Sequence, residues 1–162
     1  MFFPVERQKS SYVIDYQKWY DQGKRGIIYD IDNTLVPHGA PATDEAVALF
    51  ARLKEIGFKA CLLSNNKEPR VKSFAHAVGA YYIYKAGKPK RKGYLRACEI
   101  MEITPEQTLF IGDQIFTDIW GANRSGMDCI LVNPINPKEE IQIVLKRIPE
   151  KIVLFFYRFK RK

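Results

Sequence analysis

The sequence predicts an α/β protein in which helices cover both faces of a parallel sheet of about five strands. Short apolar runs alternate with stretches of helical character along most of the chain. Several of these apolar runs end in acidic or polar residues, which is where parallel sheets carry their chemistry. No run of about 18 apolar residues occurs, so no transmembrane helix is expected.

The first elements are the most clearly marked. Residues 26–32 (GIIYDID) are expected to form a buried strand, because a continuous apolar run leads into two acids. Residues 43–57 are expected to form a helix, with Thr43 as its cap, acids in its first turn and Gly57 as its stop. Residues 58–65 (FKACLLSN) then form the second strand.

The same alternation continues to about residue 135. It comprises a helix at 68–79, a short strand at 81–84, a helix at 90–102, a strand at 107–113, a short helix at 116–126 and a strand at 127–134. Residues 1–25 are interpreted as an N-terminal extension with a short helix near Tyr16–Gln22, residues 26–135 as the core, and residues 136–162 as a basic, amphipathic helical tail.

Composition narrows the class of protein. A chain of 162 residues suits one domain, and 46% hydrophobic with 27% charged residues is ordinary for a globular protein. The three scattered cysteines favour buried free thiols and a reducing, cytoplasmic compartment, and the N-terminus lacks the pattern of a signal peptide. The net charge of +8 gathers at residues 85–92 and at the C-terminus, which indicates anionic partners.

Polar side chains follow four of the predicted strands. Because parallel strands end at one edge of the sheet, these side chains are expected to meet there. They are Asp30 and Asp32, Ser64 and Asn65, Lys88, and Asp113 with Asp118.

These residue types permit phosphoryl transfer. Asp30, Asp32 and Asp113 form a set of oxygen ligands that suits Mg²⁺, and the charge of the ion offsets the repulsion between the acids. A carboxylate such as Asp30 can attack phosphorus to give an aspartyl-phosphate. Asp32 is placed to act as general acid and then as general base, while Ser64 and Lys88 can hold the phosphoryl oxygens.

The motifs DIDNT, LLSN, KP and GDQIFTD, in this order, resemble the four motifs of the haloacid dehalogenase (HAD) superfamily. The resemblance implies a Rossmann-like core, Asp30 as nucleophile, Asp32 as acid/base, and Ser64, Asn65 and Lys88 at the phosphate. It also implies that Asp113, Asp30 and the backbone carbonyl of Asp32 bind magnesium, while Asp118 supports the metal site or Lys88. Apart from the resemblance, Thr34 is expected to support the site by making local backbone contacts and positioning Asp32.

Finer details resemble subfamily IIIA phosphatases of the YqeG type, which are related to phosphatidylglycerophosphate phosphatases. The segments between Asp32 and Ser64 and between Ser64 and Lys88 are too short for a cap domain. An uncapped site suits a large substrate, because a small one usually needs a lid. The resemblance therefore favours a magnesium-dependent phosphomonoesterase acting on phosphatidylglycerophosphate, with a lipid head group as partner.

Alternatives stay open on the residues alone. The enzyme is also consistent with a phosphatase of phosphoproteins or of nucleic-acid ends, with nucleic acid less favoured, or with a non-catalytic scaffold that keeps the fold. Lys85, Lys90 and Lys92 compete with Lys88 as the phosphate-binding lysine. His38 is either a loop bystander or a substrate contact, and His76 is expected to be structural.

The C-terminal tail carries its own signal. Apolar residues recur at helical spacing among lysines and arginines, which is consistent with peripheral contact of an anionic membrane. The same pattern is consistent with a helix that packs on the core and ends in a basic stretch. The pattern does not fix the oligomeric state.

Overall fold

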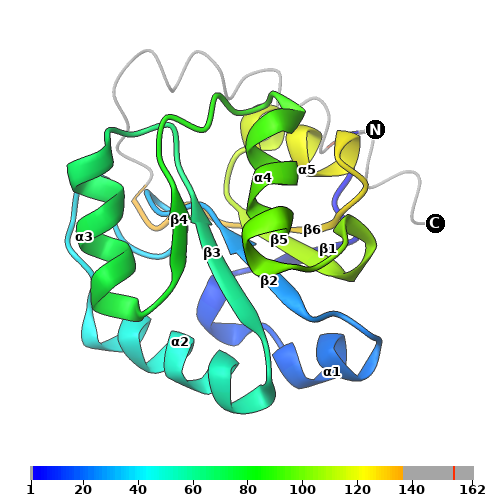
Figure 1. Ribbon diagram of the computed structural model, residues 1–162, viewed down its shortest axis with the longest axis horizontal. Helices are drawn as coiled ribbons and strands as arrows, with labels where there is room; N and C mark the ends of the chain where they lie inside the picture. Colours follow the sequence, from blue (N-terminus) through cyan, green and yellow to red (C-terminus); the bar gives the residue numbers. More distant parts are fainter. Residues whose placement is uncertain (1, 137–154, 156–162) are drawn as a thin grey trace.

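The computed structural model describes residues 2–136 and Phe155, and its centre is a six-stranded parallel sheet (Figure 1). The strands lie in the order β1-β6-β5-β2-β3-β4. Their bounds are β1 Glu6–Gln8, β2 Gly26–Tyr29, β3 Lys59–Leu63, β4 Tyr81–Ile83, β5 Thr108–Gly112 and β6 Asp128–Val132. The predicted α/β class is confirmed, with one strand more than expected.

The additional strand, β1, lies in the segment that was expected to be an extension. It pairs in parallel with β6, with Glu6 opposite Ile130 and Gln8 opposite Val132. Its sequence, ERQ, has no apolar run. Its residues are exposed or only partly buried, as is common for a strand at the edge of a sheet. A 3₁₀ turn at Ser11–Val13 and helix α1 at Tyr16–Asp21 follow it. The N-terminal residues are thus built into the sheet and its flanking layer.

The other helices are α2 Asp44–Ile56, α3 Glu68–Val78, α4 Arg91–Met101 and α5 Trp120–Arg124, with a 3₁₀ turn at Pro105–Gln107 and a π-helical turn at Ile115–Ile119. Helix α2 begins and ends as predicted. The Thr43 hydroxyl accepts a hydrogen bond from the Ala46 backbone N–H at 3.1 Å, and Gly57 closes the helix with a φ of 117°.

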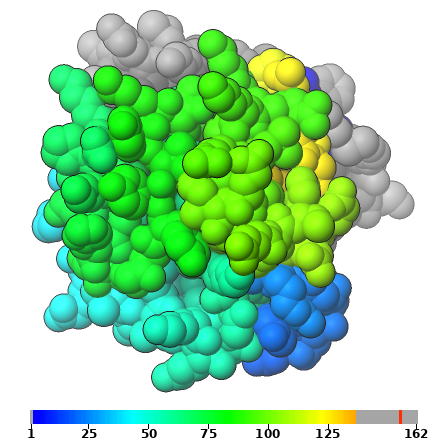
Figure 2. Space-filling view, viewed as in Figure 1, coloured from blue at the N-terminus to red at the C-terminus, as the bar shows by residue number. Residues whose placement is uncertain are grey.

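Alternating side chains of the central strands feed two separate cores. Ile27 and Tyr29 of β2 face α1, α2 and α3, whereas Ile28 faces α4 and α5. The molecule is therefore a three-layer sandwich, with α4 in front of the sheet in Figure 1. In the space-filling view the blue surface of α1 adjoins that of α2, which it contacts (Figure 2).

No further domain interrupts the chain near the predicted site. Between Asp30 and Lys88 the structure holds only a loop, α2, β3, α3 and β4, as expected for a core without a cap. The three cysteines are buried free thiols, as predicted. Among the described residues, every helix is too short or too polar to cross a bilayer. The basic tail lies outside the described residues, apart from its first residue, Asn136, and Phe155.

Candidate active site

The loop after β2 carries the two acids that open the candidate site. Strand β2 ends at Tyr29, earlier than the predicted residue 32, although the Asp30 backbone N–H still donates to the Ile111 carbonyl at 3.0 Å. The chain then turns at Asn33, which has a φ of 63° and donates its N–H to the Val36 carbonyl at 2.7 Å. After this turn, Asp30 is buried and Asp32 is partly buried as whole residues, although their side chains are equally exposed.

The Lys88 ammonium joins two of the predicted acids. It lies 2.6 Å from Asp30 Oδ1 and 2.7 Å from Asp118 Oδ1, and the Lys88 side chain is only 4% exposed. Lys85, Lys90 and Lys92, in contrast, are exposed. Of the clustered lysines, Lys88 is therefore the one whose charge lies among the acids.

Asp118 reaches this cluster because of local backbone features. The π-helical turn at Ile115–Ile119 directs it towards β5, and its second oxygen, Oδ2, accepts from the Gln114 backbone N–H at 3.1 Å. A Cβ atom at Gly112 would overlap the Asp118 carboxylate, so this position needs glycine. With Lys88 on Oδ1 and Gln114 on Oδ2, Asp118 is suited to hold Lys88 in place.

Thr34 connects the first loop to the end of β5. Its hydroxyl donates to Asp113 Oδ1 at 3.0 Å and lies 3.5 Å from Asp30 Oδ2. The expectation that Thr34 positions Asp32 is thus wrong in its target, since the contacts are with Asp30 and Asp113. Thr34 is buried, at 1% exposed, so its hydroxyl bonds to the neighbouring carboxylates of Asp113 and Asp30.

Asp32 has a separate set of partners. Its Oδ2 accepts from the Asn66 amide at 2.6 Å, and its Oδ1 accepts from the Gly39 backbone N–H at 2.8 Å and from Arg70 Nη2 at 3.0 Å. His38 Nδ1 lies 4.0 Å from the same Oδ1 and its side chain is 62% exposed. The carboxyl group is therefore held in one orientation at the mouth of the site.

The end of β3 supplies polar groups between these two clusters. The Ser64 hydroxyl accepts from the Asn66 backbone N–H at 3.1 Å. The Asn65 side chain bonds the Lys88 backbone twice, accepting from its N–H at 2.8 Å and donating to its carbonyl at 3.3 Å. Asn65 therefore fixes the loop that carries Lys88.

Burial and charge set the protonation of the inner cluster. Burial raises the pKa of Asp30 to about 7, the Lys88 ammonium opposes this rise, and the Asp118 carboxylate adds to it. Burial alone would lower the pKa of Lys88, but Asp118 and Asp30 raise it well above its ordinary value. Lys88 consequently remains a cation.

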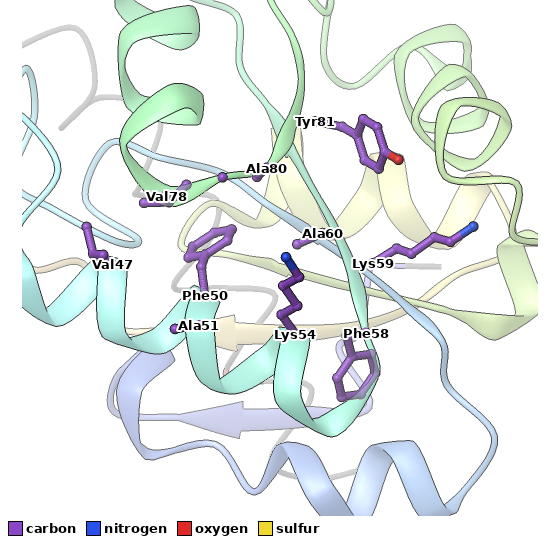
Figure 3. Close-up of a pocket in the computed structure, with 11 residues that line it drawn as sticks. Val47, Phe50, Ala51, Lys54, Phe58, Lys59, Ala60, Val78, Ala80 and Tyr81 are labelled. Carbon is purple, nitrogen blue, oxygen red and sulfur yellow. The ribbon is translucent and has the colours of Figure 1, made fainter.

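These groups line a hollow of about 260 Å³. Its walls are formed by Asp30, Asp32, Asn33, His38, Ser64, Asn65, Asn66, Lys88, Gln114 and Thr117. A larger hollow of about 610 Å³ lies at the opposite ends of the strands, between α2 and the starts of β3 and β4 (Figure 3). There, Phe50 and Lys54 of α2 face Ala60 and Ala80, and the lining includes no acid. The smaller hollow is thus the one lined by the predicted site residues.

The acids also form a group that fits a hard cation. Carboxylate oxygens of Asp30, Asp113 and Asp118 lie within 4.8 Å of one another, and all three residues are buried. The donors are exclusively oxygen atoms, which is the set that Mg²⁺ prefers.

Two contributors were not predicted. Arg70 contacts Asp32 from 38 positions away in the sequence, and Asn66 contacts it from 34 positions away. These contacts form only in the folded chain. Asn66 was part of the SNN motif, which was the only available signal. His76, expected to be structural, lies on the exposed side of α3.

Comparison with known proteins supports the family and the fold. A family model described as haloacid dehalogenase-like hydrolase matches residues 37–126, which contain Ser64, Lys88, Asp113 and Asp118 but not Asp30 or Asp32. The chain is 40% identical over 154 residues to the probable phosphatase YqeG of Bacillus subtilis, covering 94% of this chain and 90% of the relative.

Solved structures with lower identity share the fold. A putative HAD family hydrolase from Streptomyces avermitilis aligns with a TM-score of 0.56 at 16% identity, covering 71% of this chain and 76% of that one. The magnesium-bound putative HAD-hydrolase YfnB from Bacillus subtilis aligns with a TM-score of 0.51 at 14% identity, covering 74% and 91%.

Proposed function

The chain belongs to the haloacid dehalogenase-like hydrolases and is a phosphatase of this family, and we propose that it hydrolyses phosphate monoesters through an aspartyl-phosphate on Asp30 with Mg²⁺ as cofactor. The observation that carries the proposal is the buried contact of Lys88 with Asp30 and Asp118, beside Asp113. It joins a nucleophile, a phosphate-binding cation and an acidic group at one point.

The oxygen ligands of the inner cluster support a divalent cation. Carboxylate oxygens of Asp30, Asp113 and Asp118 lie within 4.8 Å of one another, and the Lys88 ammonium contacts Asp30 and Asp118. Since both oxygens of Asp118 are engaged, Asp30, Asp113 and the backbone carbonyl of Asp32 are the groups that would hold the ion. When bound, Mg²⁺ supplies positive charge that lowers the repulsion between the carboxylates and the phosphoryl oxygens.

The residues of the chain then divide the reaction. An Asp30 oxygen attacks phosphorus, a new O–P bond forms and the bond to the leaving alkoxide breaks. The Asp32 carboxyl donates its proton to that leaving oxygen, and in the second half it takes a proton from the water that attacks the aspartyl-phosphate. The oxygen of that water forms a new bond to phosphorus while the bond between phosphorus and Asp30 breaks, so phosphate leaves, Asp30 returns as a carboxylate and Asp32 regains its proton.

The phosphoryl oxygens need donors that are in place before the reaction. The Ser64 hydroxyl and the Lys88 ammonium have this role in the proposal, because both line the hollow. Asn65 acts through Lys88, whose backbone it holds. Arg70, Asn66 and Gly39 keep the Asp32 carboxyl turned towards the leaving group.

The open site favours a large substrate. No cap segment interrupts residues 30–88, and the hollow is about 260 Å³, enough for a phosphoryl group and little more. The leading substrate is phosphatidylglycerophosphate. The proposed location of the protein is the cytoplasm, with peripheral membrane contact through the tail. Phosphoproteins and nucleic-acid ends are the alternative substrates, and a non-catalytic scaffold is the alternative class.

The test is phosphate release by purified protein with and without Mg²⁺. The panel comprises an aryl phosphate, phosphatidylglycerophosphate in detergent, phosphopeptides and a 3′-phosphorylated oligonucleotide. We expect release to require Mg²⁺ and to fall about 10⁴-fold or more in Asp30→Asn, because the nucleophile is lost. Asp44→Asn, an acid in the first turn of α2, is the matched control and keeps full activity. No release from any substrate by folded, metal-binding protein would favour the scaffold.

A further inference from the structure

The N-terminal segment makes a set of hydrogen bonds with the loop that carries the acids. The Ser11 hydroxyl donates to the Thr34 carbonyl at 2.9 Å, and the Tyr12 hydroxyl donates to the Leu35 carbonyl at 2.5 Å. Ser11 is completely buried and Leu35 is 2% exposed. Both contacts join residues 23 positions apart in the sequence, and both acceptors lie just after Asp30 and Asp32.

Two tyrosines extend these contacts into a chain of hydrogen bonds, here called the brace, which comprises Ser11, Tyr12, Tyr16, Tyr29 and the Thr34 and Leu35 carbonyls. Tyr29, the last residue of β2, donates its hydroxyl to the Tyr16 hydroxyl at 2.6 Å, and Tyr16 donates to the Ser11 carbonyl at 2.5 Å. The path therefore runs from Tyr29 through Tyr16 and Ser11 to Thr34, and residues 30–33 lie between its ends. Burial raises the pKa of Tyr16 and of Tyr29, so both hydroxyls keep their donor protons.

Thr34, whose carbonyl accepts from Ser11, also contacts two of the acids through its hydroxyl. The Thr34 hydroxyl donates to Asp113 Oδ1 at 3.0 Å and lies 3.5 Å from Asp30 Oδ2, while its carbonyl is held by Ser11. A shift of the Thr34 backbone would therefore move the contact between the ends of β2 and β5. The phosphate-binding groups Ser64 and Lys88 follow β3 and β4, and their side-chain hydrogen bonds run to Asn66, Asp30 and Asp118.

We propose that Ser11 and Tyr12 are positioning residues of the phosphatase: through their hydroxyls, the N-terminal segment fixes the loop that carries Asp30, Asp32 and Thr34. This inference rests on the proposed function, because the loop matters for catalysis only if Asp30 is the nucleophile. It assigns a catalytic purpose to residues that precede the segment matched by the family model.

The test removes single hydroxyl groups. In Tyr12→Phe and Ser11→Ala we expect kcat to fall about 10- to 100-fold, since a displacement near 1 Å can cost about 100-fold. KM is expected to change less than about twofold, because the phosphate-binding side chains lie on other loops. Tyr20→Phe is the matched control: it removes a hydroxyl from α1, packs against Phe58 and leaves activity unchanged.

Amide hydrogen exchange gives a readout that does not need activity. Loss of either hydroxyl is expected to speed exchange in residues 30–36 by about tenfold, with little change in β3 or β5. Unchanged exchange and unchanged kcat in both variants would overturn the inference. A loss of activity that only follows a lower folded fraction would also overturn it, as would a loss equal to that of Tyr20→Phe. If wild-type protein releases no phosphate, the proposed function fails, while exchange in residues 30–36 still decides whether the brace exists.

Discussion

Asp30 and Asp32 lie two residues apart and have equally exposed side chains, at 12% each, yet their surroundings differ in charge. Asp30 lies with Asp113 and Asp118, and the Lys88 ammonium, whose side chain is 4% exposed, contacts Asp30 and Asp118. Asp32 pairs with its own cation, Arg70, whose side chain is 21% exposed. The inner cluster therefore brings three carboxylates together beside a buried cation, whereas the outer one is a single carboxylate paired with a less buried arginine.

The outer cluster is tested most strongly at Asp32. Asp32→Asn keeps the size of the side chain and removes its proton transfer, so kcat is expected to fall about 10²- to 10⁴-fold. An aryl phosphate should be affected less than an alkyl phosphate, because its phenolate leaving group needs less protonation than an alkoxide. Equal losses on both substrates would argue that Asp32 does not protonate the leaving oxygen. Steady-state kinetics on the two substrates makes the comparison.

The inner cluster is tested at its cation. Lys88→Met retains the length of the side chain but leaves the buried acids without their ammonium, so kcat is expected to fall about 10²- to 10³-fold. Without metal, the free energy of unfolding should also fall, since breaking a buried ion pair costs about 3–5 kcal/mol. Lys92→Met, an exposed lysine of α4, is the matched control. Similar denaturation midpoints in the two variants would show that the contacts of Lys88 with Asp30 and Asp118 do not stabilise the fold.

The stability of the metal-free protein should depend on pH through Asp30. The pKa of Asp30 is raised to about 7, so in metal-free protein the folded state binds a proton more tightly than the unfolded state. Stability is therefore expected to be greatest at low pH within this window and to decline as pH rises from about 4 to about 7.

Magnesium at 100 times its Kd should restore about 2.7 kcal/mol. Thermal unfolding at pH 5 and pH 8, with and without Mg²⁺, checks both statements. Asp113→Asn should respond less to the ion, and an unchanged response would remove Asp113 from the metal site.

The smallest effect is expected at Arg70. Arg70→Ala leaves Asn66 and Gly39 bound to Asp32, so kcat should fall only about tenfold, in the range of groups that orient another catalytic side chain. Arg96→Ala, which removes an exposed arginine paired with Glu99 on α4, should have no effect. A drop as large as that of Asp32→Asn would mean that Arg70 itself contacts the substrate.

Strand ends explain what the sequence predicts well. Asp30, Ser64, Lys88 and Asp113 each follow an apolar run, so periodicity and the rule for parallel sheets bring them to one edge. Predicted and observed helix bounds differ by one or two residues where a cap or a glycine marks them, as in α2.

What escaped prediction depends on contacts between distant residues. Arg70 of α3 meets Asp32 across 38 positions of the sequence, and Ser11 of the first 3₁₀ turn meets Thr34 across 23. Strand β1 has three residues and a polar sequence, so no periodicity marks it. The target of Thr34 was wrong because a left-handed residue, Asn33, reverses the chain after Asp32.

The two outer strands of the sheet, β1 and β4, have three residues each. An exposed strand edge offers unpaired backbone groups to other chains, and a short edge offers few of them. The longer strands, with four or five residues, are all enclosed between neighbours. The short outer strands thus leave few backbone groups open to edge-to-edge pairing with another chain.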